Sequence, residues 1–230
     1  MTVAAVILAA TAASALADAD GTPGARRLAD IAWSGGATPV VVCSFDPDGA
    51  VAAALANAEV TLVDPVAAER GPVGQMVNGV EAARRLVTDT DAVLVWPARL
   101  AWVDAETVTT LIAAHGEDRA VVLRPAYAGR PGFPVLLPVA HLDALRVLAA
   151  DRMPGELFDD LEAAGVPFRS VETGDPGVTH DVSVARADLP PFDGPPEPVE
   201  TPEWGAAAAD QPDDAPVAGP ARLSPADIED

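Results

Sequence analysis

The chain has 230 residues, of which 50% are hydrophobic, and its 35 acidic and 14 basic side chains leave a formal net charge of −21. This length allows one domain of ordinary size with an appendage, and the hydrophobic share suffices for a layered core. A surface this acidic repels polyanions, which excludes nucleic acids and anionic membranes as partners.

The chain begins with an apolar run at residues 3–8, rich in β-branched side chains. Such a run is typical of a strand buried on both faces of a sheet. Residues 15–17 look like a signal-peptidase site, but a secretory signal starts with a positive charge, and the first basic residue is Arg26. The run is also too short to span a bilayer. We therefore expect a buried first strand and a cytoplasmic protein.

Strands and helices alternate through the rest of the first 189 residues. Further strands are predicted at 39–44, 60–63, 91–95, 120–124, 133–137 and 168–172. Helices are predicted at 25–33, 48–57, 74–87, 104–116, 140–150 and 155–164, with Asp48 and Asp104 as N-caps. Pro134 favours an edge position for the strand at 133–137. Alternation of this kind predicts an α/β fold in three layers around a mostly parallel sheet.

The composition changes at Pro190. Residues 190–230 hold ten of the 23 prolines, ten acidic residues and one base, Arg222. Such a segment buries too little apolar surface to offset the entropy lost on ordering. We expect a domain at 1–189 followed by a disordered acidic tail at 190–230. The apolar residues of the tail, Trp204, Leu223 and Ile228, either form a weak docking motif for a protein partner or are scattered without a role.

Cys43 is the only cysteine, so an intrachain disulfide is impossible and a cysteine-based zinc site is nearly excluded. It lies in an apolar run, which predicts a buried core thiol. A single cysteine of this kind fits a reduced, intracellular location.

Five segments carry a family resemblance. The first strand runs into Leu8-Ala9-Ala10, and segments 71–83, 91–108, 129–137 and 174–181 follow in order. They resemble, respectively, the LAAGxxxRMGxPK signature, the GMxxSLxxGLxAA segment, the fourth strand with its DxP turn, the GRRGHPVLF stretch and the closing segment before DxDTPxDL of MobA-like nucleotidyltransferases. That family includes the enzymes that attach CMP or GMP to molybdopterin. The resemblance implies a Rossmann-like nucleotidyltransferase fold with the nucleotide over the first loop.

The resemblance also implies which residues would bind a nucleotide: Ala9, Ala10, Thr11, Gly24, Arg26, Arg27 and Gln75. Two of them depart from the family pattern, because Thr11 replaces the first loop glycine and Gly24 replaces the lysine. Only glycine lets backbone N–H groups approach a phosphate closely, and the loop aspartates Asp18 and Asp20 would repel a triphosphate. Arg26 and Arg27 either substitute as phosphate contacts or are solvated arginines on a helix face.

The metal site departs further. A gap-free alignment places Arg99 where the family has its central metal-binding aspartate, and a guanidinium offers only donors and a positive charge. Asp181 of the closing motif remains, while the second acidic position falls near Ser183. Asp181 is therefore the one candidate for a remnant catalytic residue and Mg²⁺ ligand, with His180 beside it. The alternative role for Asp181 is to cap a loop.

Three hypotheses follow. The leading one is a nucleotidyltransferase-like domain that has lost metal-dependent catalysis, a pseudoenzyme that acts by binding a nucleotide or a partner protein. The second is an active transferase with a relocated site, which uses Arg26, Arg27 and Arg124 for phosphates and Asp181 for Mg²⁺. The third is an assembly scaffold that binds its partner through the acidic tail.

Overall fold

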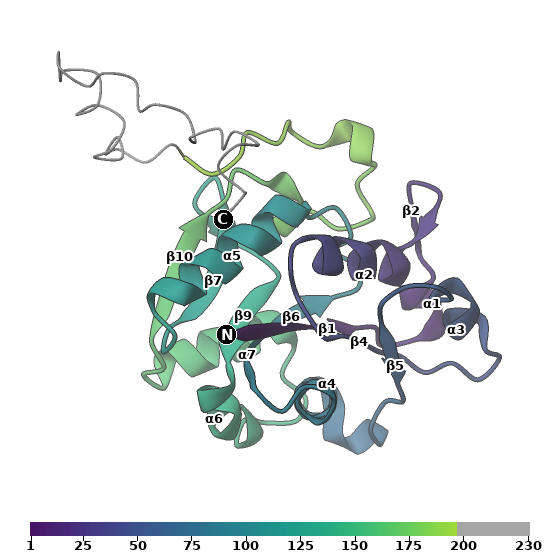
Figure 1. Ribbon diagram of the computed structural model, residues 1–230, viewed down its shortest axis with the longest axis horizontal. Coiled ribbons are helices and arrows are strands. Elements are labelled where there is room, and N and C mark those ends of the chain that lie inside the picture. Colours follow the sequence, from purple (N-terminus) through teal and green to yellow (C-terminus); the bar gives the residue numbers. More distant parts are fainter. Residues whose placement is uncertain (197–230) are drawn as a thin grey trace, which may run out of the picture. The chain divides into compact units, whose positions relative to one another are not determined.

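The computed structural model describes residues 1–196 (Figure 1). Most of the tail predicted at 190–230 therefore lies outside the described residues. The described part of it, residues 190–196, returns to the domain, where the Asp193 amide donates to the carbonyl of Gly174 at 3.2 Å. None of the helices within residues 1–196 is long and apolar enough to cross a membrane.

The domain is built on one mixed sheet, in the order β10-β7-β9-β6-β1-β4-β5, with β8 paired to β7. Its strands are β1 (Thr2–Leu8), β4 (Val40–Cys43), β5 (Thr61–Val63), β6 (Thr90–Pro97), β7 (Val122–Tyr127), β8 (Arg130–Pro131), β9 (Val135–Pro138) and β10 (Phe168–Glu172). Neighbours pair in parallel except where β9 pairs with β6 and β7, and where β8 pairs with β7. The predicted α/β class and mostly parallel sheet are confirmed.

Helices cover both faces of this sheet, with α2 and α5 on one side and α4, α6 and α7 on the other (Figure 1). Their bounds are α1 (Ala12–Ala15), α2 (Gly24–Ser34), α3 (Ala50–Ala54), α4 (Gly71–Leu86), α5 (Ala105–Glu117), α6 (Leu142–Arg146) and α7 (Pro154–Ala163). A small hairpin of β2 (Asp18–Ala19) and β3 (Thr22–Pro23) precedes α2. Short 3-10 turns occupy η1 (Ala68–Arg70), η2 (Val139–His141), η3 (Pro176–Val178) and η4 (Arg186–Asp188).

The edge position predicted for the strand around Pro134 is wrong. β9 lies inside the sheet, between β7 and β6, and Leu136 pairs with both Leu94 and Leu123. The missing N–H groups are tolerated because Pro134 precedes the strand and Pro138 ends it, so neither interrupts the ladder.

Two helix predictions also need correction. Asp48 is not the cap of α3: Gly49 holds the N-cap position at φ +73°, and the Asp46 carboxylate accepts from the amides of Val51 and Ala52 at 2.9 and 2.8 Å. The helix predicted at 140–150 is shorter, because a 3-10 turn precedes α6 and the helix ends at Arg146. By contrast, Asp104 caps α5 as predicted and accepts from the Glu106 amide at 3.0 Å.

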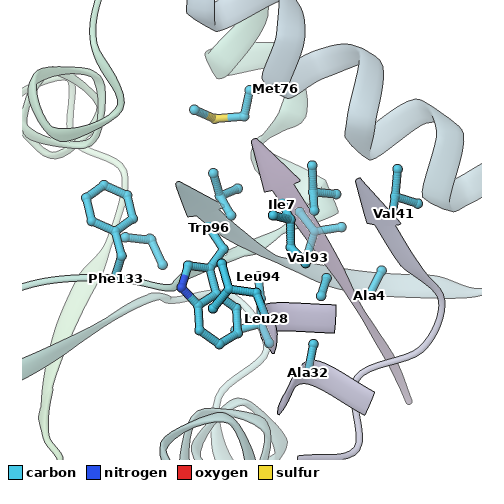
Figure 2. Close-up of a cluster of buried hydrophobic side chains, with 14 of the residues drawn as sticks. Ala4, Ile7, Leu28, Ala32, Val41, Met76, Val93, Leu94, Trp96 and Phe133 are labelled. Carbon is cyan, nitrogen blue, oxygen red and sulfur yellow. The ribbon is translucent and has the colours of Figure 1, made fainter. Parts of the chain in front are cut away.

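The core forms where the central strands meet both helix layers. Figure 2 shows Met76 of α4 on one side of the strands and Leu28 and Ala32 of α2 on the other. All three side chains are fully buried. The apolar N-terminal run is the central strand β1, whose residues from Ala4 to Ile7 are fully buried. Burial of this kind is the main favourable term in folding.

Gly79 sets the distance between α4 and β1. A Cβ atom at this position would lie 2.3 Å from Val6 Cγ1 and 3.0 Å from Cys43 Sγ. We predict that Gly79→Ala lowers the free energy of unfolding by about 1–3 kcal/mol, because the overpacked methyl pushes the helix off the sheet.

The matched control is Gly155→Ala in α7, where nothing lies within 4 Å of the added Cβ. That change should be neutral or stabilising by up to about 1 kcal/mol, as glycine is a poor helix former. Denaturant unfolding of the two variants measures both effects, and equal stabilities would contradict the packing argument.

Candidate functional site

Ligands of a parallel sheet bind beyond the carboxyl ends of its strands. At that edge, four segments follow strands: the first loop at 9–17 after β1, the turn at 98–104 after β6, and the shorter connections after β4 and β5. A fifth segment comes from the C-terminal part of the domain. We call residues 174–189 the strap, because hydrogen bonds hold it against the turn at 98–104.

The turn at 98–104 is rigidly held by its own backbone and one indole. The Ala98 amide donates to the carbonyl of Leu8 at 2.9 Å, which ties the turn to the end of β1. The buried Trp96 indole donates to the Leu100 carbonyl at 3.0 Å. Arg99 therefore projects from a preorganised turn, and its side chain is 65% exposed.

Asp175 anchors the start of the strap. Its carboxylate, with the residue only 2% exposed, accepts from the Asp104 amide, the Thr107 hydroxyl and the Gly177 amide at 2.7–2.8 Å. Burial raises the pKa of the Asp175 carboxyl, while these three hydrogen bonds act in the opposite direction. The carboxylate also lies at the N-terminus of α5, where a negative charge is favourable.

Trp102 holds the end of the strap. Its indole N–H is shared between the carbonyls of Asp181 and Val184, at 3.1 and 3.0 Å. The Val182 amide donates to the Arg99 carbonyl at 2.9 Å, so the strap also pairs with the turn through its backbone. Neither Trp102 nor Asp175 was predicted as a site residue. Both lie in segments that carry the family resemblance, 91–108 and 174–181, and the Asp-Pro-Gly at 175–177 is a turn-forming motif.

These contacts bring together Arg99 and Asp181, the two residues that the family resemblance aligned with metal-binding positions. Arg99 Nη1 lies 3.0 Å from Asp181 Oδ2, and the pair is partly open to solvent. The other carboxylate oxygen, Oδ1, accepts from both the amide and the hydroxyl of Ser183. The Ser183 hydroxyl does most to lower the pKa of the Asp181 carboxyl, partial burial opposes it, and Arg99 lowers it further.

His180 lies next to this pair. Its Nδ1 atom is 2.7 Å from the Pro176 carbonyl oxygen, which fixes the tautomer with the proton on Nδ1. The ring stands edge-on to Tyr127, with centroids 6.3 Å apart. Across residues 1–196, no three side chains of His, Cys, Asp or Glu gather closely enough to hold a metal ion.

Backbone amides of the first loop are engaged in hydrogen bonds within the protein. Thr11 caps α1, and Thr11 and Ser14 exchange amide-to-hydroxyl hydrogen bonds, both at 3.1 Å. The Ala9 amide donates to the Cys43 carbonyl at 3.0 Å, while Ala10 is exposed. The amides of Thr11 and Ser14 are therefore paired within the loop, and the amide of Ala9 is paired with β4.

The predicted phosphate contacts on α2 are also engaged. Arg26 pairs with Asp30 at 2.9 Å and donates to the Ala56 carbonyl at 2.8 Å. Arg27 donates to the Ala101 carbonyl at 2.9 Å, with its guanidinium carbon 5.6 Å from the centre of the Trp102 ring. Burial lowers the pKa of Arg27, and the nearby Arg186 lowers it further.

The remaining two residues predicted to bind a nucleotide, Gly24 and Gln75, make contacts that stabilise the local backbone. Gly24 begins α2, and its amide donates to the Ala17 carbonyl at 2.8 Å; an added Cβ would lie 3.3 Å from that oxygen and 3.4 Å from the Ala98 carbonyl. The Gln75 side-chain amide pairs with both backbone groups of Val66, at 3.2 and 3.1 Å. Gln75 thus closes the loop before α4.

Comparison with known proteins identifies the family of the chain. The model of the MobA-like NTP transferase domain matches residues 5–170. No curated protein sequence matches the chain.

Several solved structures share the fold. A nucleotidyl transferase from Methanothermobacter superposes with a TM-score of 0.64 at 19% identity, over 81% of this chain and 94% of that one. Rv0371c from Mycobacterium tuberculosis, in complex with manganese, gives 0.59 at 15% identity, over 75% and 88%. The 4-diphosphocytidyl-2C-methyl-D-erythritol synthase from Anaerococcus prevotii gives 0.59 at 10%, over 80% and 91%.

The strap contacts lead to a prediction about Asp175. Asp175→Ala leaves two buried donors and one part-buried donor without an acceptor, so we expect a loss of about 2–4 kcal/mol of unfolding free energy and faster amide exchange across residues 176–184. Denaturant unfolding and hydrogen exchange measure the two effects. Asp143→Ala on α6, whose side chain is 88% exposed, is the control. A strap that exchanges as slowly as in the unaltered protein would show that Asp175 does not anchor it.

Proposed function

The chain belongs to the MobA-like NTP transferase family, and from that premise we propose that its domain binds a ligand at the family's site without metal-dependent nucleotidyl transfer. The observation that supports this most is the pairing of Arg99 with Asp181 at 3.0 Å. In the gap-free alignment with the family pattern, the positively charged Arg99 stands where the family has its metal-binding aspartate.

The donor set does not fit Mg²⁺. This ion takes oxygen ligands in a near-octahedral arrangement, and a guanidinium supplies none. Asp181 Oδ2 is paired with Arg99, and Oδ1 already accepts from two groups of Ser183. A second cation beside Arg99 would also be repelled by it. The contrast is with Rv0371c, which shares the fold and was solved with manganese.

The first loop supports the same proposal. Catalysis of phosphoryl chemistry depends on positioned donors and positive charge around the phosphates. Here the amides of Thr11 and Ser14 are satisfied by each other's hydroxyls. The hairpin that follows adds the exposed carboxylates of Asp18 and Asp20. A triphosphate would have to displace the internal bonds and overcome this negative charge.

The alternative of an active, relocated site has less support. It needs Arg26, Arg27 and Arg124 for phosphates, and each of these is committed to a protein group. Arg124, whose side chain is 12% exposed, pairs with Asp159 at 2.6 Å. A transferase of this kind would depend on Asp181, so loss of turnover in Asp181→Ala would support it.

The ligand of the proposed site is either a nucleotide held weakly without turnover or a partner protein. An assembly role through the acidic tail is the remaining alternative, and the tail residues 197–230 lie outside the described part of the chain.

We further propose a cytoplasmic location. The single thiol, Cys43, is buried, and burial raises its pKa to about 12, which makes it unreactive.

The test compares the unaltered protein with Arg99→Asp and Arg99→Ala in thermal-shift titrations with CTP, GTP and ATP, with and without Mg²⁺ or Mn²⁺. We predict no metal-dependent shift for the unaltered protein. Arg99→Asp places two carboxylates side by side, so it should gain a Mn²⁺-dependent increase in stability, about 2.7 kcal/mol at a hundredfold excess over Kd.

Arg99→Ala is the matched control, because it removes the ion pair without adding a ligand and should not respond to metal. Pyrophosphate release is measured in parallel. A Mg²⁺-dependent shift for one nucleotide in the unaltered protein, or pyrophosphate release above that of Asp181→Ala, would contradict the proposal and identify the nucleotide donor.

A further inference from the structure

The carboxyl end of α5 contains a histidine that no contact satisfies. His115 lies in the last turn of the helix and is 0% exposed. Within the described residues, neither Nδ1 nor Nε2 has a hydrogen-bond partner. A neutral imidazole carries one donor and one acceptor, and burying both without partners is unfavourable. This end of α5 lies far along the helix from Asp104, which faces the candidate site.

Few charged groups surround this ring. Asp91, at the start of β6, favours the protonated ring, and so does Asp118, which follows α5. Arg119 opposes protonation. Asp91 is itself engaged, since its carboxylate accepts from the Thr2 amide at 2.8 Å and lies 3.7 Å from the amine of Met1.

One arginine fastens the same turn to the edge of the sheet. Arg169 of β10 donates to the Ala114 carbonyl at 2.8 Å and pairs with Glu117 at 3.2 Å. Its Nε atom is buried and, like the His115 ring, has no partner in residues 1–196. The turn thus combines unsatisfied buried groups with one side-chain attachment to β10. Ala113, Gly116 and Glu117 of this turn are exposed, and helix ends with little buried apolar surface are among the segments expected to open locally.

We infer that the last turn of α5 is a pH-sensitive lock, which stays closed while His115 is neutral and opens when acidification places a proton on the exposed ring. The lock lies away from Arg99 and Asp181, so it is independent of the function proposed for that site. The buried ring, its unpaired nitrogens and the single arginine attachment together carry the inference.

The sign of the pH dependence follows from linkage. Burial is the largest cause that lowers the pKa of His115 in the closed state. The open state keeps the ordinary value of about 6.5. The closed turn is therefore fully stable above that pH and loses stability as the pH falls below it. Each pH unit below favours opening by up to about tenfold, until the closed-state ring also takes up a proton.

Hydrogen exchange of the full chain between pH 7 and pH 5, corrected for intrinsic exchange rates, measures this opening. We expect the opening equilibrium of residues 112–117 to rise several-fold from pH 6 to pH 5, while amides of the central strand β6 stay protected. His115→Leu should remove this pH dependence. His141→Gln, at a partly exposed histidine whose Nε2 lies 2.6 Å from the Ala120 carbonyl, should keep it.

Two results would overturn the inference. One is an equal response to pH in His115→Leu and the unaltered protein, and the other is a simultaneous loss of protection in β6, which would indicate global unfolding. Should His115→Leu fail to fold, NMR titration of the His115 ring in the unaltered protein decides the matter. Titration well below the value of an exposed histidine supports the lock, and titration at about 6.5 contradicts it.

Discussion

One ion pair, Arg99 with Asp181, sets the charge at the centre of the candidate site. A carboxylate next to a metal ion and a carboxylate next to a guanidinium both gain a neutralising charge, but only the first polarises phosphate oxygens as a Lewis acid. The Arg99 guanidinium belongs to the protein, so the positive charge beside Asp181 does not depend on metal supply. Under the proposed function, a contact within the protein stands where the family pattern has a metal ion.

The surrounding structure supports that contact from both partners. The turn at 98–104 is tied to β1 and to the Trp96 indole, while Asp175 and Trp102 hold the strap that carries Asp181. In the first loop and in the arginines of α2, hydrogen-bond donors are likewise satisfied by other groups of the protein. A site whose polar groups are satisfied internally suits binding without turnover better than charge stabilisation in a transition state.

Local patterns predicted most of the fold. The apolar run of β1 and the N-cap Asp104 were identified because each reflects a short-range rule of strand burial or helix capping. The place of β9 inside the sheet was missed, since strand order depends on pairing between distant segments. Resemblance indicated that Arg99 and Asp181 occupy the metal positions, but not that they form a pair. The role of Asp175 was not predictable, because its donors at Asp104 and Thr107 are about 70 residues away in sequence.

The central claim is that Asp181 is bound to Arg99 and does not hold a metal ion. Carboxyl carbon NMR of the unaltered protein, with the Asp181 signal assigned from Asp181→Asn, tests it directly when Mn²⁺ is added. Mn²⁺ broadens the signal of any carboxylate it ligates. The account predicts an Asp181 signal that stays as sharp as that of the exposed Asp143 at stoichiometric Mn²⁺. Selective loss of the Asp181 signal would show that a metal site persists despite Arg99.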